Sequence, residues 1–401
     1  MKSKILLAFS GGLDTSFCVR YLQKEKDFEV HTATVQTGGF SAEELAAIEA
    51  QAYKLGSVSH STLDCTRDYY QRVIRFLVFG NVLRHQTYPL SVSAERMSQA
   101  LALAEYAQKL GFTALAHGST GAGNDQVRFD LVFQALLPEA TIHTPIRELR
   151  LSRAEEVAYL AADGIHFDAQ KAAYSINQGL WGTSVGGVET LNSLGSLPES
   201  AWPTPVTASE SVDLVLAFRQ GEIVGLNEQQ FEHPVDAIRA LQALAAPFGI
   251  GRDIHVGDTI IGIKGRVGFE AAAPLLIIKA HLALEKHVLS KWQLQWKEQV
   301  GSFYGNFVHE GLYLDPVMRD LEALLQSSQQ RVTGKVHLRL HPYRFETLGI
   351  ESDFDLMSAE FGSYGEMNRG WTGADVAGFT RIYGNQIRMY QQIGRKGEAK
   401  A

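Results

Sequence analysis

The chain has 401 residues, of which 45% are hydrophobic and 20% charged, so it is long enough for two ordinary globular domains. Its net charge of −7 argues against an extensive nucleic-acid surface, and no apolar run approaches the length of a membrane span or signal-peptide core. The two cysteines, Cys18 and Cys65, form no Cys-x-x-Cys pair, which argues against a disulfide framework or structural zinc site. We therefore expect a cytoplasmic protein that binds neither nucleic acid nor a membrane.

The first predicted strand is the apolar run Ile5 to Phe9, and it leads directly into Ser10-Gly11-Gly12-Leu13-Asp14-Thr15-Ser16. Such a run is typical of a strand buried on both faces, and a helix is predicted from Thr15 to Lys24. A strand, a glycine turn and a helix together direct backbone N–H groups at an anion. No lysine follows the glycines, so this is not the Gly-x-x-x-x-Gly-Lys-Ser/Thr loop. The alternative is a tight turn before a capped helix.

The next predicted elements alternate between strands and helices. The predicted strands are Val30–Gln36, Val58–Leu63 and Ala114–His117. The predicted helices are Ala42–Leu55, Thr66–Phe79, Ala94–Leu110, and one that opens at the capping box Ser152–Glu155 and ends near Asp163. This alternation implies a parallel sheet, whose ligands bind beyond the carboxyl ends of its strands.

The sequence changes character near residue 168, and an α+β domain is expected beyond it. Its predicted elements are a hairpin at Val212–Leu226, a helix at Pro234–Ala246, strands at Ile260–Lys264 and Val336–Leu340, and long helical patterns over Leu275–Leu325, broken near Gly301–Gly311. The overall fold class is therefore α/β. We expect an N-terminal parallel-sheet domain at 1–168, an α+β domain at 169–374 and a C-terminal segment at 375–401.

A second stretch contains residues that could bind a ligand, and it runs His117-Gly118-Ser119-Thr120-Gly121-Ala122-Gly123-Asn124-Asp125-Gln126-Val127-Arg128-Phe129. Its three glycines allow the backbone to approach a ligand closely. Asp125 can pair with an ammonium group, and Arg128 can bind a carboxylate through two parallel hydrogen bonds, which suits an amino-acid ligand. The alternative is a glycine-rich surface loop with an exposed ion pair.

After its buried strand, Ser10 to Ser16 resembles the pyrophosphate-binding loop of the N-type ATP pyrophosphatases. Together with His117 to Phe129 it resembles the argininosuccinate synthase family. Further matches cover most of the chain, at Tyr88–Arg96, Tyr174-Ser175, Trp181–Ser184, Gly249–Arg252, Gly262–Lys264 and Phe269-Glu270. The resemblance implies an adenine nucleotide α-hydrolase-like domain, a synthetase and oligomerisation domain, and a homotetramer. It also implies that citrulline, aspartate and MgATP give argininosuccinate, AMP and pyrophosphate through a citrullyl-adenylate, in arginine biosynthesis.

The resemblance assigns binding residues by position. It implies that ATP contacts Ala8, Phe9, Ser10, Gly11, Gly12, Leu13, Asp14, Thr15, Ser16, Val35 and Gly118. It implies that aspartate contacts Thr120, Asn124 and Asp125, and that citrulline contacts Tyr88, Ser93, Asn124, Arg128, Ser175 and Ser184. Asp14 and Asp125 are the candidate catalytic residues. Mg²⁺ is expected with ATP, but neither a metal ligand nor a general base is identified.

The sequence departs from the family pattern at Gly257 and Phe269, where the family has a glutamate and a tyrosine that contact citrulline. Asp258, next to Gly257, is a candidate replacement for the lost carboxylate. We favour a divergent branch of the family over an adenylating ligase for an acylated citrulline. A tRNA-modifying N-type ATP pyrophosphatase would need a basic face and, for sulfur transfer, usually a reactive cysteine pair. A nucleotide-sensing protein would bind ATP without releasing pyrophosphate.

Overall fold

The computed structural model describes residues 2–167, 174–357 and 370–398. The chain separates into two compact units, one up to Phe354 and one from Asp355 onward, and each is described by itself. The expected boundary at 168/169 lies outside the described residues, so the three-part division of the chain stays a prediction. The predicted α/β fold class is confirmed, because the first unit combines a parallel sheet with antiparallel sheets and helices.

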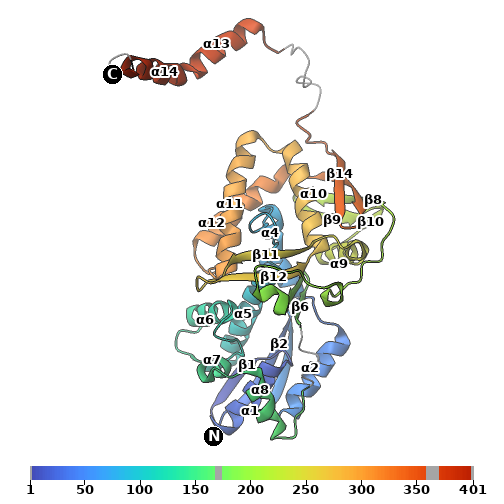
Figure 1. Cartoon of the computed structure of the whole chain (residues 1–401), viewed down its shortest axis with the longest axis vertical. Helices are drawn as coiled ribbons and strands as arrows, with labels where there is room; N and C mark the ends of the chain where they lie inside the picture. The colour runs from blue at the N-terminus through green and yellow to red at the C-terminus, as the bar shows by residue number, and fades with distance from the viewer. Residues whose placement is uncertain (1, 168–173, 358–369, 399–401) are drawn as a thin grey trace. The chain divides into compact units, whose positions relative to one another are not determined.

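The first sheet contains five parallel strands in the order β3-β2-β1-β4-β5. Its strands β1 and β2 are labelled in Figure 1. They are β1 (Lys4–Ala8), β2 (Glu29–Gln36), β3 (Ser59–Asp64), β4 (Ala114–Ala116) and β5 (Thr141–His143). The strand order reverses direction between β1 and β4, which are neighbours in space but far apart in sequence. In such sheets this switch point, at the carboxyl ends of the strands, is where ligands bind.

Helices cover both faces of this sheet, as the buried run in β1 predicts. Ile5 and Leu7 face a core with α1 (Leu13–Lys24), α2 (Ala42–Lys54), α7 (Pro145–Leu149) and α8 (Arg153–Ala161). Leu6 faces the other core, with α3 (Thr66–Tyr69), the π-helical turn Tyr70–Ile74, α4 (Arg75–Phe79), α5 (Ser91–Leu110) and α6 (Asp125–Leu136). The predicted capping box at Ser152 and Glu155 is present at the start of α8.

The remainder of the first unit is built on two antiparallel sheets. One contains β6 (Ser175–Gly179), β7 (Gly182–Gly186), β11 (Arg252–Asp258) and β12 (Lys264–Glu270). The other contains β8 (Val212–Arg219), β9 (Glu222–Leu226), β10 (Gln229–Gln230), β13 (Gly334–His341) and β14 (Arg344–Glu351). The accompanying helices are α9 (Pro234–Ala245), α10 (Ala272–Val288), α11 (Lys291–Glu310) and α12 (Val317–Ser328). The predicted hairpin at Val212–Leu226 is confirmed, with Gln220 and Gly221 both at positive φ in its turn.

One prediction in this part is wrong, and another holds only at one end of its range. Ile260–Lys264 is largely the turn between β11 and β12, where Thr259 Oγ1 donates to Ile263 O and Gly262 has a φ of 82°. Its apolar side chains resemble a strand in sequence, but Ile263 is 61% exposed. The break expected near Gly301–Gly311 falls at Gly311, the C-cap of α11, whereas Gly301 lies inside that helix and packs directly against the backbone at Gly80.

The second unit contains α13 (Gly373–Tyr383) and α14 (Asn385–Glu398). Its large apolar side chains are exposed, and they are Trp371, Val376, Phe379, Ile382, Tyr383, Ile387, Met389, Tyr390 and Ile393. Of the helices that the structure describes, none is long and apolar enough to cross a membrane.

We predict that Gly301→Ala destabilises the protein although alanine favours helices. A Cβ at this position would lie 2.2 Å from the carbonyl oxygen of Gly80, a backbone atom that cannot move without displacing α4. Overpacking of this kind costs about 1–3 kcal/mol. Urea denaturation should show the loss, whereas the control Gly349→Ala, with nothing within 4 Å, should change stability little. Equal stability of the two variants would contradict this account.

Candidate active site

A cleft of about 720 Å³ lies at the carboxyl ends of β1, β2 and β4. Its opposite wall comes from β6, which belongs to the antiparallel part of the unit. Among the predicted binding residues, those on its wall are Ala8, Phe9, Ser10, Gly12, Leu13, Asp14, Thr15, Val35, Gly118, Thr120, Asp125 and Ser175. The structure therefore gathers both glycine motifs around one cavity.

The first glycine loop ends at α1, whose N-cap is Gly12 and has no side-chain hydrogen bond. The first N–H groups of a helix have no partner within the helix, so this end of α1 offers donors to an anion. Gly11 has a φ of 75°, which favours glycine. Gly11 and Ser16 are the two predicted ATP contacts that do not line the cleft, and Ser16 is fully buried. The assignment of the loop to ATP stays a prediction.

The second glycine loop is held by a buried histidine that the sequence analysis did not select. His117 lines the cleft, and its Nδ1 atom accepts a hydrogen bond from the Ser119 N–H. Its proton is therefore on Nε2, which donates to Asp130 Oδ1 at 3.0 Å. Arg147 donates to the other oxygen of Asp130 at 2.7 Å. Burial alone would raise the pKa of Asp130, but the bonds from His117 and Arg147 more than offset it and lower that pKa.

Two of the predicted aspartate-binding residues, Asn124 and Asp125, form side-chain hydrogen bonds to other parts of the chain. Asn124 Oδ1 accepts from the Ile260 N–H at 2.8 Å, which ties the loop to the turn between β11 and β12. Asp125 accepts from Arg128 Nη1 through Oδ1 at 2.9 Å and from Arg96 Nε through Oδ2 at 3.2 Å. Asp125 is therefore clamped by two guanidinium groups, in place of the single exposed ion pair of the alternative interpretation.

Most of the predicted citrulline residues lie beneath the wall of the cleft. Ser175 lines the cleft, whereas Tyr88, Ser93, Arg128 and Ser184 are each 2–4% exposed. Arg128 donates to Ser93 Oγ at 3.0 Å and to the carbonyl oxygen of His309 at 2.8 Å. These side chains form a buried polar layer, and their contact with a substrate stays a prediction.

The structure shows what occupies the space beside Gly257 and Phe269. A Cβ at Gly257 would lie 2.5 Å from Nε2 of His255, so the imidazole fills the position of a side chain there. The His255 ring stacks on Tyr88 with centroids 5.0 Å apart, and Phe269 packs against the same tyrosine at 5.2 Å. Burial lowers the pKa of His255 to about 4, so it is neutral at physiological pH. Asp258 is paired with Lys264 at 2.6 Å.

The sequence analysis did not assign the polar wall contributed by α5 and β6. Glu95, Arg96 and Gln99 line the cleft from α5, and Asn177 faces them from β6. One signal in the sequence was available, because Arg96 and Gln99 are polar residues three positions apart and so lie on the same face of the predicted helix. Their partner Asn177 could not be found in this way, because it is distant in sequence.

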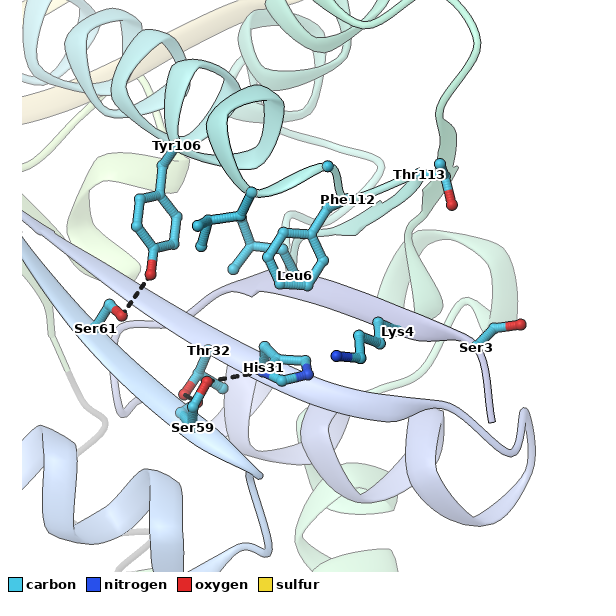
Figure 2. A pocket seen from close by; sticks show the side chains of 12 residues that line it. Ser3, Lys4, Leu6, His31, Thr32, Ser59, Ser61, Tyr106, Phe112 and Thr113 are labelled. Atoms are coloured by element: carbon cyan, nitrogen blue, oxygen red, sulfur yellow. Dashed lines mark hydrogen bonds between the residues drawn. The ribbon is translucent and has the colours of Figure 1, made fainter. Parts of the chain in front are cut away.

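A second cavity of about 470 Å³ lies at the other end of the sheet, near the start of β1 (Figure 2). Its polar side chains largely satisfy one another. Ser61 Oγ and Tyr106 Oη are 2.7 Å apart, and so are His31 Nδ1 and Ser59 Oγ. It lies at the amino ends of the strands, away from the edge where parallel sheets bind ligands.

A buried acid lies next to the first turn of α1. Glu156, on α8, is 2% exposed, and its Oε2 atom has no hydrogen-bond partner. Its carboxyl group interacts with that of Asp14, which lines the cleft. Burial and the neighbouring Asp14 carboxylate raise the pKa of Glu156 from its ordinary 4.5 to about 8.

We predict that Glu156→Gln changes how stability depends on pH. The folded wild type keeps a proton that the unfolded chain releases above pH 4.5, so this stabilisation is complete below that pH and is lost as the pH rises through about 8. Relative to Glu156→Gln, the wild type should lose stability as the pH rises from about 5 to 9. Denaturation in metal-free buffer measures this, and parallel pH profiles would contradict it.

Comparisons with known proteins agree with the two motifs. Two protein-family models match the sequence. The one described as arginosuccinate synthase N-terminal HUP domain matches residues 4–166, and the one described as arginosuccinate synthase C-terminal domain matches residues 174–390. The argininosuccinate synthase of Xanthomonas campestris is 38% identical, covering 98% of this chain and all of the relative. Those of Methanocaldococcus jannaschii and Sulfurisphaera tokodaii are 35% and 33% identical over 98% and 97% of this chain, covering 98% and 99% of the relatives. With both glycine motifs on one cleft and both family models matched, this chain belongs to the argininosuccinate synthase family.

Proposed function

We propose that the chain is a ligase that joins citrulline and aspartate at the expense of ATP, giving argininosuccinate, AMP and pyrophosphate. The observation that carries this proposal is the convergence of the two glycine loops on one cleft, in a chain that belongs to the argininosuccinate synthase family. Arginine biosynthesis in the cytoplasm is the setting that we propose for this reaction.

The reaction must overcome the poor leaving ability of a ureido oxygen. In our proposal, the ureido oxygen of citrulline attacks the α-phosphorus of ATP, and the bond to pyrophosphate breaks. The amine of aspartate then attacks the ureido carbon, the C–O bond to AMP breaks, and the amine loses a proton. In this proposal, the unpaired N–H groups at the start of α1, beside the cleft, stabilise the charge of the departing pyrophosphate. Since no general base stands out, we assign most of the rate to positioning.

Mg²⁺ is proposed to enter as a complex with ATP. Among the described residues, no group of three or more His, Cys, Asp or Glu side chains is arranged to hold a metal ion. Mg²⁺ commonly uses one or two carboxylates together with substrate phosphates, and Asp14, on the wall of the cleft, fits that requirement. When bound, the ion would neutralise charge on the phosphates.

Two alternatives are less well supported. A sulfur-transferring tRNA enzyme needs paired reactive thiols, but Cys18 and Cys65 pack into cores on opposite faces of the parallel sheet. Burial raises the pKa of both thiols, to about 11 for Cys65. An acylated citrulline would need space near Tyr88, where His255 and Phe269 already pack. The full-length relatives also favour argininosuccinate synthase itself.

We predict that purified protein releases pyrophosphate from MgATP only when both L-citrulline and L-aspartate are present. An enzyme-coupled pyrophosphate assay with each substrate omitted in turn tests this. Argininosuccinate identified by mass spectrometry would show that the pocket tolerates Gly257 and Phe269. Pyrophosphate release with an N-acylated citrulline but not with citrulline would instead support the alternative, a ligase for an acylated citrulline. No release with either would overturn the proposal.

We also propose that the chain forms a homotetramer and that α13 and α14 contribute to its assembly. Apolar side chains exposed in such number are typical of a contact surface, and in α13 they include Phe379 and Ile382, which are 62% and 78% exposed. We predict that Phe379→Glu with Ile382→Glu shifts the particle mass below that of a tetramer, measured by light scattering after gel filtration. Thr380→Glu, which adds charge at a polar position, is the control. An unchanged mass in the double variant would contradict a role for this helix.

A further inference from the structure

Arg96 occupies the junction between the two walls of the cleft. It lies on α5, lines the cleft and has a side chain that is 18% exposed. Its guanidinium donates to Asn177 Oδ1 at 2.7 Å, to Gln99 Oε1 at 2.9 Å and to Asp125 Oδ2 at 3.2 Å. Glu95 Oε2 lies 3.4 Å from the same group. One side chain therefore connects α5 with β6 and with the first turn of α6.

The carboxylate of Asp125 is held from both sides. Arg128 approaches one oxygen at 2.9 Å, and Arg96 approaches the other at 3.2 Å. Arg128 is itself fixed by the carbonyl oxygen of His309, so it cannot follow Asp125 if the carboxylate rotates. With both oxygens engaged, the plane of the carboxylate is set, and the lone pairs that remain can accept from an ammonium group at the cleft.

The charges at this junction favour the same arrangement. Burial alone would lower the pKa of Arg96, but the carboxylates of Asp125 and Glu95 more than offset this and raise it, so Arg96 stays charged. Glu95 is 4% exposed and accepts from Thr37 Oγ1 at 2.5 Å. The junction is therefore fully partnered before any substrate binds, and removing Arg96 would leave a carboxylate oxygen of Asp125 without its partner.

We propose that Arg96 is a positioning residue for the amine nucleophile, because it orients Asp125 and ties it to β6 through Asn177. This inference rests on the proposed function and deepens it. It assigns a role in recognition of the aspartate ammonium group to a residue that acts through Asp125. It also means that the Arg96 guanidinium binds both β6, which presents Ser175 to the cleft, and α6, which presents Asp125, and so fixes these two elements relative to each other.

The test is a double-mutant cycle with Arg96→Gln, Asp125→Asn and the double variant. Loss of a hydrogen bond to a charged group corresponds to about a ten- to hundredfold effect. Arg96→Gln should therefore raise the KM for aspartate by about tenfold or more and leave the KM for ATP within about twofold. If Arg96 acts through Asp125, the double variant should be no worse than Asp125→Asn alone. Arg96→Lys should not restore the wild-type KM for aspartate, because the ammonium group of lysine cannot reproduce the several directed N–H donors of the planar guanidinium.

A matched control separates positioning from general destabilisation. Arg72→Gln removes an ion pair between Arg72 and Glu105 of α5, at 2.6 Å, outside the cleft. It should leave all three KM values unchanged. A second measurement needs no turnover, since aspartate should raise the melting temperature of the wild type and of Arg72→Gln but not of Arg96→Gln. If Arg96→Gln does not fold, Asn177→Ala can be used instead, because it removes only the partner of Arg96 on β6. This variant should show a smaller rise in KM, confined to the KM for aspartate.

The outcomes separate this inference from the proposed function. An inactive wild type would overturn the proposed function, and this inference with it. An active wild type with effects of Arg96→Gln and Asp125→Asn that add would overturn only the positioning role. The same conclusion would follow from an equal rise in the KM values for ATP, citrulline and aspartate. An increase confined to aspartate, absent in the Asp125→Asn background, would establish it.

Discussion

The neighbouring parallel strands β1 and β4 impose the constraint on which the site depends. Their carboxyl ends bring the two glycine loops so close that a Cβ at Gly118 would lie 3.2 Å from Thr15 Cγ2. Only a residue without a side chain fits there without displacing the start of α1. The pairing of His117 with Asp130 then sets the path of the second loop. The cleft is thus a consequence of sheet order, and its chemistry is set by the loops.

The second wall is joined to the first by equally close backbone contacts. A Cβ at Gly39 would lie 2.0 Å from the carbonyl oxygen of Gln178, and one at Gly38 would lie 2.9 Å from Leu180 Cβ. The loop after β2 therefore packs directly on the end of β6. Arg96 and Glu95 complete this joint with polar contacts, so the glycine-loop side and the β6 side of the cleft are held in a defined relation.

A layer of buried polar side chains that hydrogen-bond to one another lies beneath the cleft. Arg128, Ser93 and the carbonyl oxygen of His309 satisfy one another away from solvent, where an unpaired group would be costly. Gly257 and Phe269, where the sequence analysis expects a departure from the family pattern, lie at the edge of that layer. There the neutral ring of His255 stacks on Tyr88 and fills the space beside Gly257. His255, Tyr88 and Phe269 therefore pack together as one aromatic group at this edge.

Local signals in the sequence determined much of this protein. The apolar run of β1, the glycine turn before α1, the capping box at Ser152 and the hairpin at Val212–Leu226 each depend on residues close in sequence, and each was predicted. The features that join segments distant in sequence were set by the tertiary structure and were not predictable from local sequence patterns. The turn at 259–263, whose Ile260 N–H donates to Asn124, the packing of α11 at Gly301 and the partners Asn177 and Asp130 all involve contacts between segments that are more than ten residues apart. A pattern of residue types records which faces are apolar, but which segments meet is decided only when the sheets pair and pack.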